Sequence, residues 1–263
     1  MVLAGRTQMM DSYPVPEALA KMRAVGLAGA EICVEDIKFN IRGELLDPPY
    51  LADAAASLRE LGFEAWSYSY HADYITDDEV LTRTIRTIEL TRELDTDVFV
   101  FSGRRRDKRA NAAEEWRALV ERTRPLVDAA EANGVRLALE TEPGFYCGTS
   151  AELLRLIEEM DSPALGANMD IGHAFLVDPD PIEAIRSLDG RIFHAHVENM
   201  RRGVHDHRLP HDGDMDLAAY LHALDGAGLD GPAAFDLYGY DYESILPGAI
   251  SHVQGLLAAA GSG

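Results

Sequence analysis

The sequence predicts a single α/β domain over residues 1–263, folded as a (β/α)₈ TIM barrel. Eight short apolar segments alternate with helical patterns along the chain, and this alternation is typical of βα units that form a parallel sheet. The length of 263 residues matches the size of about 250 residues that is common for this barrel. A doubly wound open sheet is the alternative, but no G-x-G-x-x-G motif follows the first predicted strand.

The predicted strands are short runs of apolar, aromatic and β-branched residues, each followed by a polar segment. The second, fourth and fifth runs are almost continuously apolar, as expected of strands that are covered on both faces. In chain order, the predicted strands are residues 1–5, 29–33, 64–69, 97–102, 135–140, 164–170, 191–197 and 232–237.

The predicted helices fill the intervals between the strands. The clearest covers 112–133, where Trp116, Leu119 and Val127 recur at helical spacing. It ends at Asn133-Gly134, a common helix stop, and the next strand begins at once. The segments "RELG" at 59–62 and "RELD" at 92–95 close two other helices in the same manner. We find no linker and expect one domain.

Charge and cysteine content limit the classes of function. The chain has 24 Lys and Arg against 45 Asp and Glu, a formal net charge of −21, which disfavours nucleic acid because tight binding to it depends on neutralising phosphates. No apolar stretch approaches membrane-spanning length, and the N-terminus lacks the pattern of a secretory signal. Two cysteines provide no disulfide framework. We therefore expect a cytoplasmic protein that binds neither nucleic acid nor membrane.

Polar residues at the ends of the predicted strands are the candidates for an active site, because TIM-barrel sites lie where strands end and βα loops begin. Residues that can bind a metal ion are concentrated at these positions. They are His71 after strand three, Glu140 and Glu142 at strand five, Asp170 and His173 at strand six, His194 and His196 in strand seven, and Asp236 in strand eight; His205, His207 and His211 follow in one loop.

Each of these residues has an ordinary structural role when it is considered alone. Glu140 or Asp170 could cap the following helix, and a lone inward-facing histidine is more often a hydrogen-bonded core residue than a ligand. Their convergence favours a metal site, because several carboxylates placed together are costly without a cation. Donors that are mostly oxygen suit Mn²⁺ best, with Mg²⁺ or Co²⁺ as alternatives, and zinc held by histidine and carboxylates stays possible.

Four segments carry a resemblance to a known family. In order, "ALETEPG", "GANMDIGHAF", "FHAHVENMRRGVHDHRLPHDGDMD" and "GPAAFDLYGY" resemble the sugar phosphate isomerase/epimerase superfamily of xylose isomerase-like TIM barrels. Ketose 3-epimerases, hydroxypyruvate isomerase, inosose dehydratase and endonuclease IV belong to it. The resemblance implies a metal bound by Glu140, Asp170, His196 and Asp236, and substrate-oxygen contacts from His173 and from Arg201 or Arg202. It also implies a small carbohydrate-like substrate and, as in many relatives, a possible homo-oligomer.

The sequence departs from the family pattern in several places, and two of these departures bear directly on the reaction. The family usually has Glu where this chain has Asp236, a side chain shorter by one methylene, and this puts a simple epimerase mechanism in doubt. Strand four ends in "FVFSG", without the histidine that the trinuclear zinc site of endonuclease IV needs. Together with the negative charge, this second departure disfavours a DNA-repair nuclease.

The leading hypothesis is a divalent-metal-dependent isomerase or epimerase that acts on a sugar or sugar-like hydroxy-carbonyl substrate. Proton transfer would pass through a metal-stabilised enediolate, with Glu140 and Asp236 as base and acid. His173 and Arg202 would anchor substrate oxygens, with Glu142 and His71 as secondary candidates. The alternatives are a metal-dependent lyase, dehydratase or C-glycoside-cleaving enzyme on the same site, and a barrel that binds metal but has lost catalysis.

A short basic loop, "GRRRDKR" at 103–109, follows strand four. We interpret it as a solvated loop or a subunit contact. The functional alternative is that its arginines bind a phosphate or carboxylate of the substrate, since the planar guanidinium suits either anion.

Overall fold

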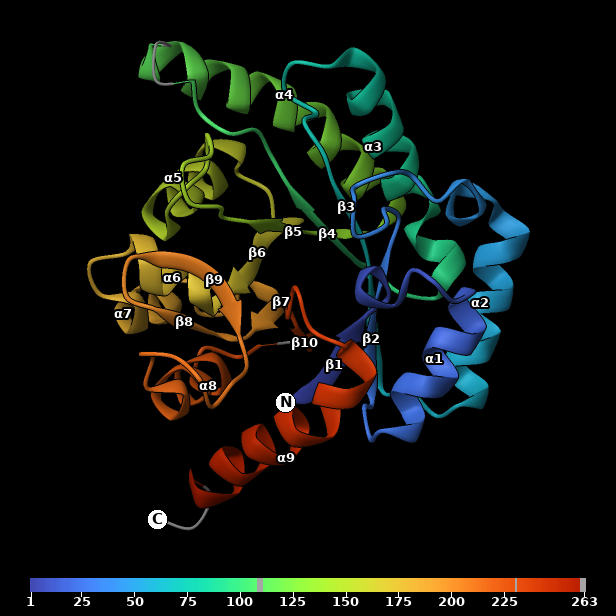
Figure 1. The fold of residues 1–263 in the computed structure, drawn as a ribbon. Helices are drawn as coiled ribbons and strands as arrows, with labels where there is room; N and C mark the ends of the chain where they lie inside the picture. Colours follow the sequence, from blue (N-terminus) through green and yellow to red (C-terminus); the bar gives the residue numbers. More distant parts are fainter. Residues whose placement is uncertain (108–110, 230, 261–263) are drawn as a thin grey trace.

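The computed structural model describes residues 1–107, 111–229 and 231–260, and it confirms the predicted TIM barrel (Figure 1). Eight parallel strands close into one barrel in the order β1-β10-β7-β6-β5-β4-β3-β2. Each overlaps one predicted strand. They are β1 (Val2–Arg6), β2 (Gly29–Cys33), β3 (Ala65–His71), β4 (Val98–Ser102), β5 (Arg136–Glu140), β6 (Leu165–Asp170), β7 (Ile192–Val197) and β10 (Pro232–Phe235).

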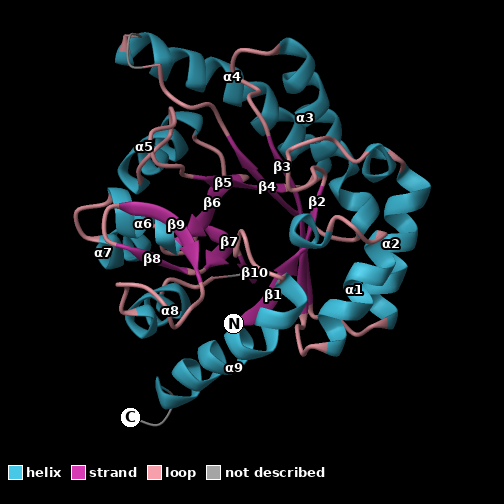
Figure 2. Ribbon diagram, in the orientation of Figure 1, coloured by secondary structure: helices cyan, strands magenta, loops and turns pink. Residues whose placement is uncertain are grey.

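The helices lie around the outside of the strands (Figure 2). Two predicted helix ends are confirmed by their backbone conformation: α4 stops at Gly134 with φ +63°, and the 3-10 helix Thr91–Leu94 stops at Asp95 with φ +55°. Along the described part of the chain, every helix is too short or too polar to cross a bilayer. They are α1 (Val15–Ala24), α2 (Pro48–Glu60), α3 (Asp78–Leu90), α4 (Ala112–Asn133), α5 (Ser150–Met160), α6 (Ile171–Val177), α7 (Pro181–Ser187), α8 (Leu217–Gly226) and α9 (Tyr242–Ala260).

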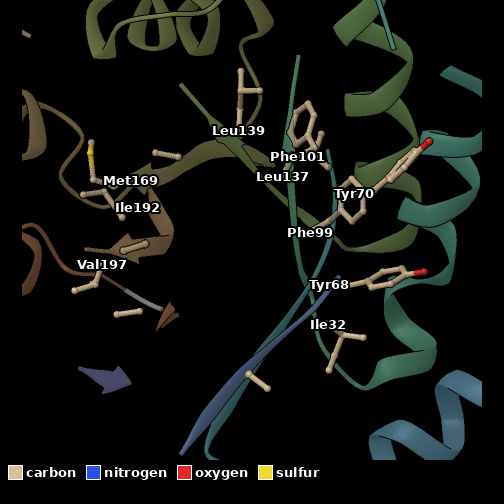
Figure 3. Close-up of a cluster of buried hydrophobic side chains, with 14 of the residues drawn as sticks. Ile32, Tyr68, Tyr70, Phe99, Phe101, Leu137, Leu139, Met169, Ile192 and Val197 are labelled. Atoms are coloured by element: carbon tan, nitrogen blue, oxygen red, sulfur yellow. The ribbon is translucent and has the colours of Figure 1, made fainter. Parts of the chain in front are cut away.

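One face of the barrel strands carries the main hydrophobic core. Side chains at every second strand position, such as Tyr68, Phe99, Phe101, Leu137 and Leu139, belong to one cluster and are completely buried (Figure 3). Full burial of a side chain of this kind contributes roughly 1.5–3 kcal/mol relative to leaving it exposed. This face therefore anchors the helices to the barrel.

The alternate strand positions carry a different set of residues, because successive side chains of a strand point to opposite faces. Many of these positions hold buried polar or charged residues that lie opposite one another on neighbouring strands. In the strand register, Glu31 lies opposite Ser67, Glu140 opposite Asn168 and Asp170 opposite His196. Buried polar groups need partners. The opposite strand face thus combines these buried polar groups with a small apolar cluster of Val98, Val100, Ala138 and Phe193, and several of the polar groups belong to the site described below.

The segment after β7 differs from the loop that the sequence predicted. It forms an antiparallel hairpin of β8 (Asn199–Arg201) and β9 (Val204–Arg208), which lies against α6 (Figure 1). Its pairing places His205 and His207 of β9 together at the end of the barrel. A sequence segment rich in His, Asp and Gly has no strand pattern, which is why the hairpin was not predicted.

Candidate active site

A cavity of about 630 Å³ opens at the carboxyl ends of the barrel strands. This is the position predicted from the strand ends, and the lining includes seven of the candidate residues named from the sequence. The lining residues are Arg6, Phe39, His71, Ala72, Asp73, Ser102, Gly103, Arg104, Arg105, Glu140, Glu142, Phe145, His173, His205, His207, Asp236 and Tyr238.

Three of the predicted metal ligands form a buried cluster beside this cavity. Glu140, Asp170 and His196 each offer a ligand atom, and these atoms lie within 4.8 Å of one another. His196 Nδ1 is 3.3 Å from Glu140 Oε2 and 3.6 Å from Asp170 Oδ2. Burial raises the pKa of Glu140, but His196 and His71 outweigh this effect and hold the pKa well below its usual range. The Glu140 side chain therefore stays negatively charged although it is buried.

The chemistry of this cluster fits a divalent cation. Two carboxylates and one imidazole are buried together, and Asp170 Oδ2 has no hydrogen-bond partner in the described structure. An unpaired buried carboxylate oxygen is costly, and a cation would remove that cost. Oxygen-rich donor sets with one imidazole are used by Mn²⁺, Mg²⁺ and Co²⁺, and also by zinc.

Asp236, the fourth residue of the implied metal set, lies in a neighbouring cluster. It is buried, its Oδ1 accepts a hydrogen bond from the Arg6 guanidinium, and its Oδ2 lies 3.2 Å from His207 Nδ1. The ligand atoms that lie close to it belong to Asp170, Glu198 and His207. The structure thus gathers three of the four predicted ligands in one group, and joins Asp236 to that group through the shared Asp170.

Arg6 and Glu31 were not among the residues predicted from the sequence. Arg6 Nη2 is 3.1 Å from Glu31 Oε1, and Glu31 Oε2 is 2.9 Å from His196 Nε2. Burial raises the pKa of Glu31, but the opposing charges of Arg6 and His196 hold it well below its usual range. The signal that would have found them is a charged residue inside or at the end of a predicted strand, in "MVLAGR" and "GAEIC".

Asp170 has two roles, because it also begins α6. Its side chain is the N-cap of that helix and accepts a hydrogen bond from the His173 backbone N–H at 2.7 Å. Glu198, a third residue that was not predicted from the sequence, accepts a hydrogen bond from the Gly172 N–H at 2.7 Å. A Cβ on Gly172 would lie 2.1 Å from Glu198 Oε1 and 2.5 Å from Met200 Cε. Glycine is needed here for close packing against Glu198.

Replacing Gly172 with alanine is expected to displace Glu198 and to lower stability by roughly 1–3 kcal/mol, the usual cost of overpacking. Gly255→Ala in α9 is the matched control, because nothing lies within 4 Å of its Cβ position and alanine is the better helix former. Urea unfolding of both variants measures the difference. Equal stability of the two variants would contradict the packing role of Gly172.

Most of the remaining predicted histidines contact the cluster or one another, whereas the centre of the His211 ring lies 5.8 Å from that of His252 in α9. His71 Nδ1 is 2.8 Å from Glu35 Oε1 and its Nε2 is 3.2 Å from Glu140 Oε2. Burial lowers the pKa of His71, but hydrogen bonds to the two carboxylates prevail and raise it to about 10. His71 thus supplies positive charge beside Glu140.

His173 lies between the cluster of Glu140, Asp170 and His196 and the hairpin formed by β8 and β9. Its Nδ1 lies 3.0 Å from the Thr141 carbonyl oxygen, and its Nε2 lies 2.9 Å from His205 Nε2. His205 Nε2 is in turn 3.2 Å from His207 Nε2. Glu142 Oε2 is 3.9 Å from His173 Nε2. The cavity wall therefore combines three imidazoles with a carboxylate.

The two arginines implied as substrate contacts do not line the cavity. The side chain of Arg201 is 54% exposed and its Nε is 2.7 Å from Asp206 Oδ2. Arg202 is exposed, and its guanidinium carbon lies 5.0 Å from the centre of the Phe175 ring. Arg104 and Arg105 of the basic loop do line the cavity. Lys108 and Arg109 of that loop lie outside the described residues.

Comparison with known proteins shows one family. Residues 19–255 match the family described as "Xylose isomerase-like TIM barrel". A 3-dehydroshikimate dehydratase of Pseudomonas putida is 26% identical over 86% of this chain and 36% of its own length. An inosose dehydratase of Geobacillus thermodenitrificans is 27% identical over 45% of each chain. The region aligned with this chain therefore covers less than half of the full length of either relative.

Solved structures share the fold at low sequence identity. An L-ribulose 3-epimerase has a TM-score of 0.79 at 19% identity, covering 98% of this chain and 95% of that chain. The IolI protein with a bound zinc atom has a TM-score of 0.78 at 20% identity, covering 98% and 97%. These likenesses establish the architecture over nearly the whole chain.

Proposed function

The chain belongs to the family of xylose isomerase-like TIM barrels, and on this premise we propose that it is a divalent-metal-dependent isomerase or epimerase. Its substrate is a sugar or a sugar-like hydroxy-carbonyl compound, and its reaction transfers a proton at a carbon next to the carbonyl group. The observation that carries the proposal is the buried group of Glu140, Asp170 and His196 beside an open cavity, in which one carboxylate oxygen of Asp170 has no hydrogen bond to any described residue.

Glu140, Asp170 and His196 would hold the ion, with Asp236 adjacent to them through Asp170. A bound divalent ion polarises a carbonyl oxygen and lowers the cost of negative charge on the neighbouring carbon. We propose Mn²⁺ because most of the donors are carboxylate oxygens, and the zinc atom bound by the structurally similar IolI protein makes Zn²⁺ the first alternative to test.

Glu140 and Asp236 are proposed as the pair that moves the proton. Both line the cavity, and they come from β5 and from the end of β10, which β6 and β7 separate in the barrel. One carboxylate takes the proton from carbon and the other returns a proton, and an epimerase, which inverts that carbon, needs the two to approach the substrate from different sides. Arg6 orients Asp236 by its hydrogen bond, and His173 is placed to hold a substrate oxygen.

Dehydration is the second candidate, and the histidines of the cavity favour it. After removal of the C–H proton, a carbon–carbon double bond forms while the neighbouring C–O bond breaks, and the departing hydroxyl takes a proton to leave as water. His173, His205 and His207 line the cavity and could supply that proton. Two relatives of this chain bear the names 3-dehydroshikimate dehydratase and inosose dehydratase, which supports this route.

Product analysis in deuterated water separates the two reactions and tests the proposal. With Mn²⁺ present, we expect turnover of at least one compound from a panel of ketoses, inososes and hydroxylated keto acids, and we expect a chelator to abolish it. An isomerase gives a product of unchanged mass apart from incorporated deuterium, whereas a dehydratase gives a product lighter by one water. Full turnover by protein that is shown by elemental analysis to be free of metal would refute metal dependence.

A further inference from the structure

The three arginines that follow β4 are held in different ways. Arg106 donates to the carbonyl oxygens of Phe145 at 2.6 Å and Tyr146 at 3.0 Å, and it forms an ion pair with Glu152. Arg104 forms an ion pair with Asp73 and donates to Thr76 Oγ1 at 2.8 Å. Both charges are therefore matched by a carboxylate of the protein.

Arg105 has no such partner within the described parts of the chain. Its side chain is exposed and lines the cavity, and its guanidinium carbon lies 5.4 Å from the centre of the Phe145 ring. Its backbone is held in place, since Arg105 forms an isolated bridge with Phe145 and the Tyr146 N–H donates to the Arg104 carbonyl oxygen at 2.8 Å. The backbone thus keeps this guanidinium at the cavity while its donors stay available.

Elsewhere in the cavity lining, the positively charged side chains lie against carboxylates: Arg6 pairs with Asp236, Arg104 with Asp73 and His71 with Glu140. Four carboxylates line the cavity, those of Asp73, Glu140, Glu142 and Asp236, and the whole chain carries a formal charge of −21. A guanidinium without a protein carboxylate is unusual in such surroundings, because a nearby carboxylate would stabilise it. Arg105 therefore marks the place in the cavity where a negative group of a ligand is favoured.

One phenyl ring lies beside this place, and a second belongs to the same cavity lining. Phe145 contacts Arg105, and Phe39 lines the same cavity with 59% of its surface exposed. An exposed aromatic side chain at a cavity offers an apolar surface for the carbon skeleton of a ligand. The cavity thus presents the Phe145 ring next to the free guanidinium, a second apolar ring in Phe39, and carboxylates and imidazoles at the proposed metal-binding end.

We propose that the substrate is a hydroxylated carboxylic acid whose carboxylate is bound by Arg105, away from the reacting carbon. The inference deepens the proposed function and rests on it for the position of the reacting end at Glu140 and Asp236. A carboxylate is preferred to a phosphate because one planar guanidinium matches its two oxygens and its single charge. A phosphate carries more charge than Arg105 neutralises, and the charges of Arg104 and Arg106 are already matched.

Two probes that differ mainly in the carboxylate test the inference. Quinate is a polyhydroxylated cyclohexane with a carboxylate, and myo-inositol is a polyhydroxylated cyclohexane without one. By titration calorimetry on the full chain, we expect quinate to bind at least about ten times more tightly than myo-inositol, since charge-assisted hydrogen bonds are the strong ones. Arg105→Gln is expected to remove this preference, and Arg105→Lys to retain part of it. Arg86→Gln, which makes the same charge change on the exposed face of α3, is expected to leave it intact.

The outcomes that overturn the inference are specific. The inference fails if the natural chain binds neither probe or binds both equally, or if Arg105→Gln keeps the preference for quinate. D-fructose 6-phosphate is a third arm, and tighter binding of this compound that depends on Arg105 would replace the carboxylate with a phosphate. Because binding is measured without turnover, these failures leave metal dependence untouched. Loss of metal dependence with an intact quinate preference would refute the proposed function alone.

Discussion

Replacing Glu140 with glutamine is expected to lower kcat by about 10³-fold or more, within the range of about 10²–10⁴-fold found for a positioned acid or base. The amide keeps the shape of the side chain but loses its charge. It also presents an NH₂ group toward His71 or His196, whose nitrogens lie 3.2 Å and 3.3 Å from Glu140 Oε2. Steady-state kinetics with the substrate found in the panel measures the loss.

Metal content provides a second measurement for this variant. If Glu140 is a ligand, the variant binds Mn²⁺ more weakly than the natural chain in titration calorimetry while its circular dichroism spectrum stays the same. Glu158→Gln, the same chemical change on the exposed face of α5, is the control and should alter neither property. Unchanged kcat and unchanged metal affinity in Glu140→Gln would remove Glu140 from both proposed roles.

Replacing Arg6 with methionine is expected to lower the free energy of unfolding by about 3–5 kcal/mol, the usual result of removing one partner from a buried ion pair. Arg6 is 2% exposed and pairs with both Glu31 and Asp236. Methionine has a similar length but no charge, so it leaves two buried carboxylates without their cation. Urea unfolding at neutral pH measures the change.

The matched control for this prediction is a surface pair. Arg59 and Asp95 also form an ion pair, but their side chains are 52% and 55% exposed, and pairs of this kind are typically worth less than about 1 kcal/mol. Arg59→Met is therefore expected to change stability only slightly. If the two variants lost the same amount, burial of the Arg6 pairs would have no energetic significance.

The barrel could be predicted from the sequence because its strands and helix ends leave strong local patterns. The apolar runs at 97–102 and 135–140 and the Asn133-Gly134 stop each depend on residues that are adjacent in the chain. The strand-end rule then located the cavity, since residues such as Glu140 and His173 follow their strands directly. What the rule requires is only the direction of each strand, which the βα alternation supplies.

The pairs that surround Asp236 could not be predicted in this way. Arg6 reaches Asp236 only because β1 lies beside β10 when the barrel closes, and no local pattern contains that closure. His205 and His207 depend on a hairpin whose sequence does not alternate. The implied role of Arg201 and Arg202 rested on resemblance alone. The structure places neither side chain in the cavity lining, so their contact with substrate stays a prediction.

The cavity is made of two kinds of segment, and this division affects how the protein can evolve. Glu140, Asp170 and His196 belong to barrel strands, where a substitution disturbs the ladder and the buried polar network together. Arg105, His205 and His207 lie on segments outside the barrel ladder, and surface segments tolerate change far better than the elements that they connect. New substrate preferences can therefore arise by mutation of these segments while the proposed proton-transfer chemistry is kept.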